Sequence, residues 1–219
     1  MRHDIFAVVP VKGLAAAKSR LSTTYSPQFR SGLATAMLED VLATLAAVRE
    51  LAGIVVVTTD SLARELAMRF GARVLDEGAD NGQTSAVISA ARCLVVEGRA
   101  GMLAVPGDIP CMTTSEVSRL IAAHRAAPSF SIVPAHDRRG SNAILMSPPD
   151  AVPLAFGNDS FLPHLEAARH CGIDPMILPM PGIGLDIDSA ADLALLIHRP
   201  MPIRTWSFLA AEGLVPVAR

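Results

Sequence analysis

The sequence predicts an α/β protein with a mostly parallel, mixed β-sheet and helices on both faces of the sheet. Two observations predict this fold class. Short apolar segments alternate with longer helical patterns along nearly the whole chain, which is typical of parallel strands joined by crossover helices. The chain is also 51% hydrophobic but only 4% aromatic, a composition that suits strands buried beneath helices rich in alanine and leucine.

Seven apolar segments are the predicted strands. In chain order they cover residues 5–9, 53–58, 73–75, 102–105, 130–134, 143–146 and 176–178. Only a short polar turn over residues 136–140 separates the fifth segment from the sixth. We therefore expect these two strands to form an antiparallel hairpin within the otherwise parallel sheet.

Six helical patterns lie between or after the strands. They cover residues 27–49, 61–70, 84–97, 115–126, 161–171 and 189–198. Ser26 is the expected N-cap of the first helix, with Pro27 at its first position, and Asp60 precedes the second helix.

A length of 219 residues suits one α/β domain with a full core. We expect a single domain over residues 1–199. The tail over residues 200–219 carries Trp206, Phe208 and Leu209. It is expected to pack on its own domain as a helix or, alternatively, to form a contact in a homodimer.

Charge, cysteine content and hydropathy disfavour several classes of function. The net charge of −2 gives no broad basic face, so a nucleic-acid partner is disfavoured. Cys93, Cys111 and Cys171 lack zinc-type spacing and are expected to be reduced thiols. We expect a cytoplasmic protein, because no apolar run has the length of a membrane span and residues 1–4 leave no room for a signal peptide. His164 and His170 are expected at the surface.

The loop after the first strand combines cations with small residues. Lys12, Lys18 and Arg20 follow Pro10, and Gly13 lets a ligand approach the backbone. Ligands of open α/β sheets bind at the carboxyl ends of the strands, where such cations can hold a polyphosphate. A solvated basic turn is the alternative interpretation. No carboxylate partner for Lys18 is evident in the sequence, so this side chain is expected to contribute little to stability.

Asp108 follows the fourth predicted strand, in a turn fixed by two prolines and a glycine. This position lies at the ligand-binding edge of the sheet, so a functional carboxylate is favoured. Capping of the next helix is the alternative, but that helix is expected to begin near Thr113 or Thr114.

Asp186 and Asp188 form a second acidic segment. In an extended chain their side chains share a face, while Ile187 turns into the core. Two neighbouring carboxylates repel each other unless a cation lies between them, and such oxygen ligands suit Mg²⁺ held together with substrate phosphates. The alternative is that Asp188 caps the final helix and Asp186 is solvated.

Polar residues also precede the third predicted helix. Gly82, Gln83 and Ser85 could read a base or hold a phosphate at the start of this helix. Ordinary capping by Asn81 or Thr84 is the alternative, and it is slightly favoured.

A further polar group precedes the fifth helix. Gly157 permits close approach of a ligand, and Ser160 can donate to an anion at the helix N-terminus. The alternative is a cap provided by Asn158 or Ser160. Asn142, at the start of the sixth strand, would by itself be a plain turn residue.

Five segments together resemble a known family. They are residues 9–21, 107–110, 142–145, 156–160 and 186–193. In the same order, and over nearly the whole chain, they resemble the CofC/FbiD guanylyltransferases of deazaflavin coenzyme F-420 biosynthesis. The resemblance implies a nucleotidyltransferase fold, Rossmann-like and related to the GT-A glycosyltransferases.

By this resemblance, the chain would join GMP from GTP to the phosphate of a three-carbon phospho-acid and release pyrophosphate. The acid would be phosphoenolpyruvate, 2-phospho-L-lactate or, as in a minority of members, 3-phospho-D-glycerate. The resemblance assigns Mg²⁺ to Asp108, Asp186 and Asp188, and the phospho-acid to Asn142, Gly157 and Ser160. The expected nucleotide-binding residues are Pro10, Lys12, Lys18, Arg20, Gly82, Gln83 and Ser85. Lys18 and Asp108 are the expected catalytic residues.

Two other interpretations stay open. One is a different nucleotidyltransferase of the same fold, such as a cytidylyltransferase or a molybdopterin guanylyltransferase. The other is a non-catalytic nucleotide-binding protein, which the three aspartates disfavour because binding alone needs no metal cluster.

Overall fold

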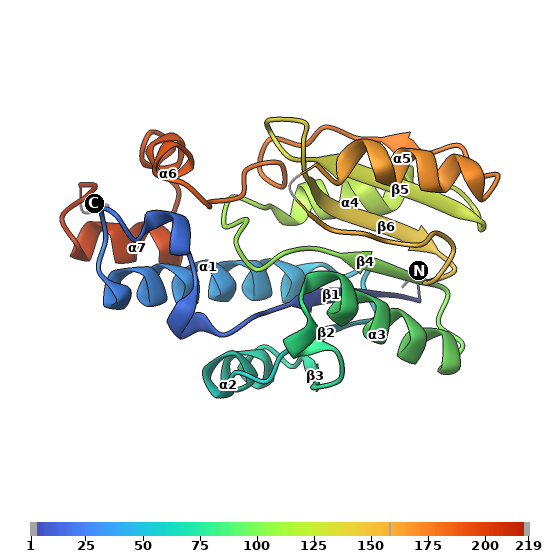
Figure 1. The fold of residues 1–219 in the computed structure, drawn as a ribbon, viewed down its shortest axis with the longest axis horizontal. Helices are drawn as coiled ribbons and strands as arrows, with labels where there is room; N and C mark the ends of the chain where they lie inside the picture. Colours follow the sequence, from blue (N-terminus) through green and yellow to red (C-terminus); the bar gives the residue numbers. More distant parts are fainter. Residues whose placement is uncertain (1–3, 158, 217–219) are drawn as a thin grey trace.

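The computed structural model describes residues 4–157 and 159–216, and its seven strands form one sheet in the order β3-β2-β1-β4-β6-β5-β7 (Figure 1). The strands are β1 (Ile5–Pro10), β2 (Gly53–Val57), β3 (Arg73–Leu75), β4 (Gly101–Ala104), β5 (Ser129–Pro134), β6 (Ser141–Ser147) and β7 (Met176–Ile177). Only β6 runs antiparallel to its neighbours, β4 and β5. This arrangement confirms the predicted mixed, mostly parallel sheet and the hairpin.

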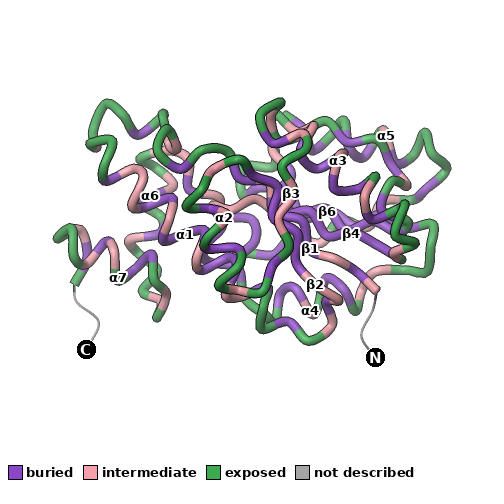
Figure 2. The backbone as a smooth tube through the Cα atoms, turned by 90° about the horizontal axis from the view of Figure 1, so that it is seen from below, coloured by how far each residue is buried: buried purple, intermediate pink, exposed green. Residues whose placement is uncertain are grey.

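Helices cover both faces of the sheet. They are α1 (Pro27–Ala47), α2 (Ser61–Arg69), α3 (Gln83–Val96), α4 (Thr114–Ala123), α5 (Phe161–His170), α6 (Ala190–Ile197) and α7 (Arg204–Ala211), with short 3-10 helices η1 (Leu14–Ala16), η2 (Ser19–Leu21) and η3 (Ala79–Asn81). Buried residues of α1, α2 and α4 form one apolar layer with the sheet, and those of α3 and α5 form the layer on its other face. The buried segments in Figure 2 run through these layers.

Local sequence signals account for most helix starts. Ser26 Oγ accepts a hydrogen bond from the Phe29 backbone amide, and Pro27 occupies the first position of α1, as predicted. Asp60 caps α2 in the same way. Thr113 and Ser189 begin α4 and α6 with capping boxes. The prediction that α4 begins near Thr113 is therefore confirmed.

The C-terminal segment packs beside α1. Trp206 and Leu209 of α7 are buried with Phe29, Leu33 and Met37 in a third apolar cluster. The carboxylate of Asp40 in α1 accepts hydrogen bonds from the backbone amides of the first two residues of α7, each at 2.8 Å. These contacts fix α7 along the half of α1 that extends past the sheet (Figure 1).

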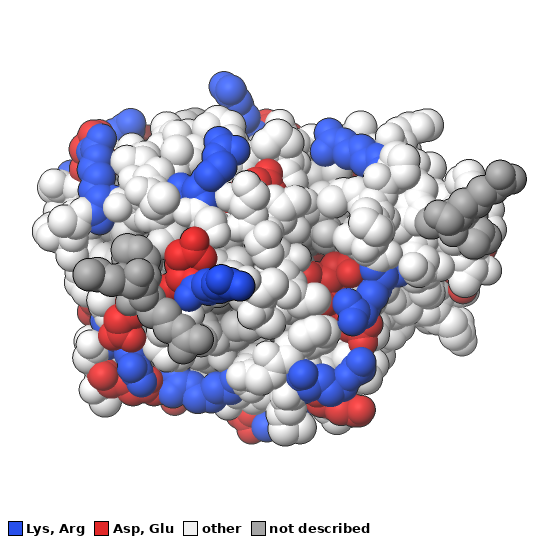
Figure 3. Space-filling model, turned by 180° about the vertical axis from the view of Figure 1, so that it is seen from behind, with Lys and Arg blue, Asp and Glu red and all other residues white. Residues whose placement is uncertain are grey.

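Charges of both signs are interspersed over the surface shown in Figure 3. Within the described ranges, no helix has the length and apolar character needed to cross a membrane.

Candidate active site

Two cavities adjoin at the carboxyl ends of the parallel strands. The first has a volume of about 680 Å³ and lies between the loop after β1 and the start of α3. The second has a volume of about 380 Å³ and lies between the start of β6, the start of α5 and the segment before α6. Gln83, Pro106, Asp108 and Asp188 line both cavities. The two carboxylates therefore stand where the cavities meet.

The loop after β1 is held in place by two hydrogen bonds to other segments of the chain. The Leu14 backbone amide donates to Asp60 Oδ2 at 2.9 Å. Arg30 donates to the backbone carbonyl oxygen of Ala17 at 3.2 Å. Lys18 adopts a left-handed backbone conformation with φ of 55°, which is uncommon for a residue with a side chain. The loop is thus fixed to α1 and α2 on one side, and it turns at Lys18 toward the carboxylates.

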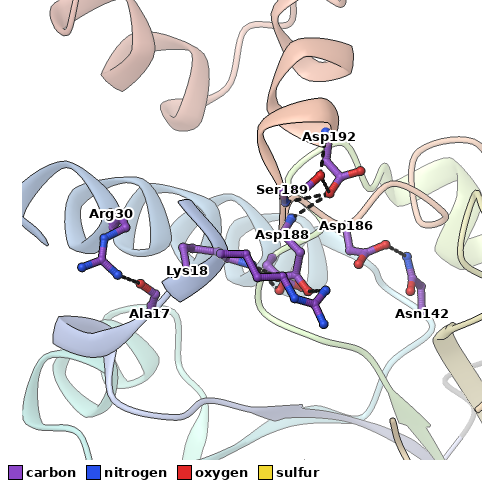
Figure 4. A network of polar contacts seen from close by, with 10 residues as sticks. Ala17, Lys18, Arg30, Asn142, Asp186, Asp188, Ser189 and Asp192 are labelled. Atoms are coloured by element: carbon purple, nitrogen blue, oxygen red, sulfur yellow. Dashed lines mark hydrogen bonds and ion pairs between the residues drawn. The ribbon is translucent and has the colours of Figure 1, made fainter. Parts of the chain in front are cut away.

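Lys18 connects both acidic segments. Its Nζ donates to Asp108 Oδ2 at 2.5 Å and to Asp188 Oδ1 at 2.7 Å (Figure 4). The Lys18 side chain is only 6% exposed. Burial alone would lower its pKa, but the charges of both aspartates and the hydrogen bonds to them raise the pKa above its ordinary value. The expectation that Lys18 lacks a carboxylate partner is wrong, because two partners approach it from distant parts of the chain.

Asp108 is joined to the second acidic segment through the backbone as well. The Ile187 amide donates to the Asp108 carbonyl oxygen at 3.0 Å, and the Ile187 side chain is fully buried. The predicted inward orientation of Ile187 is therefore confirmed. Asp108 Oδ1 is buried and has no hydrogen-bond partner among the described residues. A buried carboxylate oxygen without a donor is costly unless a positive group completes its surroundings.

Asp186 has a different partner from Asp188. Asn142 Nδ2 donates to Asp186 Oδ1 and to the Ile183 carbonyl oxygen, both at 3.0 Å. Burial raises the pKa of Asp186, and the hydrogen bond from Asn142 opposes this shift. The alternative in which Asp188 caps α6 is wrong, because the Ser189 side chain provides the cap.

Asn142, Gly157 and Ser160 all line the second cavity. Ser160 precedes α5, but its side chain makes no capping bond and instead donates to Ser141 Oγ at 3.2 Å. The alternative cap by Ser160 is therefore wrong, and Asn158 lies outside the described residues. A Cβ atom on Gly157 would meet open space, so this glycine leaves room in the cavity.

Most of the expected nucleotide residues line the first cavity. They are Pro10, Lys12, Lys18, Gly82 and Gln83. Arg20 lines the second cavity instead, with its guanidinium 3.6 Å from Asp188 Oδ2, and Ser85 lines neither cavity.

The start of α3 is not capped by a side chain. Gly82 occupies the N-cap position with φ of 91°, a conformation that favours glycine, so capping by Asn81 or Thr84 is wrong. Thr84 Oγ1 accepts a hydrogen bond from the Phe156 backbone amide at 2.9 Å, which ties this segment to the wall of the second cavity.

Sequence reasoning missed Ser141 and misplaced His164. His164 is only 1% exposed, so the prediction that it lies at the surface is wrong. It follows Ser160 by four positions and therefore lies one helical turn further along α5, on the same side of the helix. That spacing is the signal that could have revealed a polar pair behind the cavity wall.

The second cavity is rich in acidic groups. Five aspartates line it: Asp108, Asp137, Asp186, Asp188 and Asp192. The basic residues in its lining are Arg20 and His136. An anionic ligand in this cavity would be repelled unless additional positive charge accompanied it.

A sheet of this order, with two adjoining cavities at the carboxyl ends of its parallel strands, defines a nucleotidyltransferase fold. The solved structure of a 4-diphosphocytidyl-2C-methyl-D-erythritol synthase superposes with a TM-score of 0.62 over 90% of this chain and 97% of the other, at 17% identity. A protein of Desulfovibrio desulfuricans G20 assigned as a nucleotide-diphospho-sugar transferase gives a TM-score of 0.74 over 96% of both chains, at 19% identity. At these identities the similarity is one of fold.

The family model described as "Guanylyl transferase CofC like" matches residues 5–213. The chain belongs to this family and is a nucleotidyltransferase. It is 38% identical to the phosphoenolpyruvate guanylyltransferase of Rubrobacter xylanophilus, over 88% of this chain and 93% of the relative. It is 34% identical to the 3-phospho-D-glycerate guanylyltransferase of Colwellia psychrerythraea, over 93% of this chain and 95% of the relative.

Proposed function

We propose that this guanylyltransferase joins the GMP moiety of GTP to the phosphate of phosphoenolpyruvate and releases pyrophosphate, within coenzyme F-420 biosynthesis. One observation carries the proposal: the two cavities meet at Asp108 and Asp188. A nucleotide in the first cavity and a small acid in the second would have their reacting groups at this junction. Bringing two anions together there is the main task of the protein.

The chemistry needs little covalent help from the chain. The phosphate of the acid already carries an anionic oxygen, which can attack the α-phosphorus of GTP without a general base. Pyrophosphate then leaves from the opposite side. Lys12 and Lys18 line the nucleotide cavity and would neutralise the phosphates and the charge that develops on the leaving oxygens.

Mg²⁺ is the proposed metal, held by Asp108, Asp186 and Asp188. The chemistry of these donors fits, because hard carboxylate oxygens suit Mg²⁺ and Asp108 Oδ1 is buried without a partner. In the described part of the chain, no three such side chains are already gathered as metal ligands. The Lys18 ammonium group joins two of them, and Asn142 holds the third. When bound, the metal would supply positive charge to both substrates in the acidic cavity.

A second acid is supported by a specific observation. The relative from Colwellia psychrerythraea, named for 3-phospho-D-glycerate, is nearly as similar to this chain as the one from Rubrobacter xylanophilus, named for phosphoenolpyruvate. Further relatives from Sphaerobacter thermophilus and Conexibacter woesei, at 36% and 32% identity, carry the phosphoenolpyruvate name. The balance of these names favours phosphoenolpyruvate, with 3-phospho-D-glycerate as the alternative. 2-Phospho-L-lactate is the third acid to test.

The experiment is product analysis by mass spectrometry. Each of GTP, ATP, CTP and UTP is incubated with each of the three acids, with and without Mg²⁺. We expect GTP and phosphoenolpyruvate with Mg²⁺ to give the largest yield of the joined product. A higher yield with CTP would favour a cytidylyltransferase, and a higher yield with 3-phospho-D-glycerate would change the assigned acid.

A further inference from the structure

A chain of three buried polar side chains lies behind the wall of the second cavity. Ser141 begins β6, Ser160 precedes α5, and His164 lies one turn into α5. Their exposed fractions are 7%, 5% and 1%. Ser141 and Ser160 line the cavity, whereas His164 is not among its lining residues. The histidine therefore lies behind the cavity wall, where its ring packs edge-on against Phe156 and its Nδ1 meets the Ser141 hydroxyl.

The hydrogen bonds of His164 fix its tautomer. The Ala155 backbone amide donates to His164 Nε2 at 3.0 Å, so Nε2 must present a lone pair. A neutral ring then carries its hydrogen on Nδ1, which lies 2.9 Å from Ser141 Oγ. Burial lowers the pKa of His164 to about 4, in agreement with a neutral ring at neutral pH. His164 Nδ1 is consequently the donor to Ser141.

Ser141 Oγ therefore receives two hydrogen bonds, one from His164 and one from the Ser160 hydroxyl at 3.2 Å. Both acceptor positions of the Ser141 oxygen are occupied. Its own hydrogen is directed to neither neighbour, and Ser141 lines the second cavity, where a ligand can accept that hydrogen. The arrangement turns Ser141 into a fixed donor toward a ligand.

The position of Ser141 indicates which part of the ligand it meets. The phosphate of the acid must reach the junction of the cavities, where Asp108 and Asp188 line both. Ser141 lines the second cavity but not the first, so we expect it to meet the group of the acid that lies farther from the nucleotide. In a three-carbon phospho-acid that part is the carboxylate.

We propose that Ser141 donates a hydrogen bond to the carboxylate of the phospho-acid, and that His164 is the positioning residue that holds Ser141 in its donating orientation. This inference rests on the proposed function and assigns two specificity-determining residues to it. A fixed donor favours an acid over a simple phosphate ester, because the ester has no carboxylate to receive the hydrogen bond.

The test measures steady-state constants for GTP and phosphoenolpyruvate in Ser141→Ala, together with inhibition by ethyl phosphate, which lacks a carboxylate. We expect the KM for phosphoenolpyruvate to rise roughly tenfold or more, as for loss of a hydrogen bond to a charged group. The KM for GTP and the inhibition constant of ethyl phosphate should stay within about twofold of wild type, since neither involves a carboxylate. The matched control is Ser147→Ala. Ser147 lies at the other end of the same strand, where its hydroxyl forms a hydrogen bond with a different histidine, His124, at 3.2 Å.

His164 is tested with two variants. His164→Leu removes the donor to Ser141 and should raise the KM for phosphoenolpyruvate with little change for GTP. His164→Asn places an amide nitrogen near the position of Nδ1 and should restore much of the lost affinity. A merely structural role would change the constants for both substrates and the melting temperature together. If His164→Leu does not fold, the Ser141→Ala result decides the proposal by itself.

Three results would overturn the proposal in distinguishable ways. An unchanged KM for phosphoenolpyruvate in Ser141→Ala, with active wild type, removes the role of Ser141 but leaves the proposed function intact. An equal loss for ethyl phosphate shows that Ser141 meets the phosphate and not the carboxylate. Absence of guanylyl transfer to any of the three acids by wild type removes the proposed function and this inference with it.

Discussion

Lys18 Nζ lies 2.5 Å from Asp108 Oδ2, across 90 positions of the sequence, and the same ammonium group reaches Asp188. One cation from the loop after β1 thus holds together two acidic segments from other parts of the sheet edge. This contact offsets part of the negative charge where the two cavities meet. It couples the loop after β1 to the proposed metal ligands.

Replacing Lys18 should affect both stability and nucleotide binding. Lys18→Met removes the cation that two neighbouring carboxylates share and leaves the Arg20 guanidinium, 3.6 Å from Asp188, as a more distant one. We expect the free energy of unfolding without Mg²⁺ to fall by about 1–3 kcal/mol, between the values for exposed and buried pairs. The KM for GTP should rise roughly tenfold. Urea unfolding and initial rates measure the two effects. Lys12→Met is the control, because the Lys12 side chain is exposed. This variant should bind GTP more weakly without loss of stability. An unchanged free energy of unfolding in Lys18→Met would contradict a structural role for the contacts of Lys18 with Asp108 and Asp188.

Asp108→Asn should fold but lose most of its activity. The amide keeps the size of the side chain and can still accept from Lys18, whereas its reduced charge weakens metal binding at the junction. We expect kcat to fall at least about 100-fold, in line with the several kcal/mol that a metal contributes. Melting curves with and without Mg²⁺ give an independent readout, because we expect Mg²⁺ to raise the melting temperature of the wild type and to raise that of the variant less. Asp174→Asn, at an exposed ion pair with Arg125, is the control. Near-normal turnover in folded Asp108→Asn would remove the metal assignment.

Gly157→Val should impair binding of the acid without harming the fold. A Cβ atom at this position meets nothing within 4 Å, so the added side chain would occupy space in the second cavity. We expect a higher KM for the phospho-acid, a nearly unchanged KM for GTP, and a melting temperature close to that of wild type. Loss of affinity for both substrates in equal measure would show that Gly157 does not belong to a separate acid site.

His164 should make stability depend on pH. Its pKa falls from 6.5 to about 4 on folding, so the unfolded chain binds more protons than the folded chain between these values. The contribution of His164 to the free energy of unfolding is fully present above pH 6.5 and is lost as the pH falls toward 4. This loss is on the order of 3 kcal/mol. Urea unfolding followed by the buried Trp206 measures it. The difference in the free energy of unfolding between wild type and His164→Asn should shrink by this amount as the pH falls from 6.5 to 4. A difference that stays constant with pH would contradict the burial of a neutral His164 ring.

The sequence was sufficient to predict most of the fold because its signals are local. Ser26, Asp60 and Thr113 mark helix starts through contacts only three residues long, and the hairpin before Ser141 follows from the short turn. The order of the strands in the sheet needs contacts between segments far apart in the chain. That information is absent from local periodicity.

The site shows the same division between local and long-range information. The carboxylates at strand ends could be identified from their positions after apolar segments, and both Asp108 and Asp188 do line the cavities. The partners of Lys18 could not be identified, because they lie 90 and 170 positions away. His164 was misplaced for a related reason, since its burial depends on β6 and on the segment around Ala155 packing against α5.

The most direct test of guanylyl transfer to a phospho-acid uses phosphoenolpyruvate labelled with ¹⁸O in its phosphate group. Attack by an oxygen of this phosphate on the α-phosphorus of GTP would keep all of the label in the joined product. Mass spectrometry should therefore find the label complete in that product and absent from pyrophosphate. Unjoined GMP, or label in the released pyrophosphate, would contradict the account.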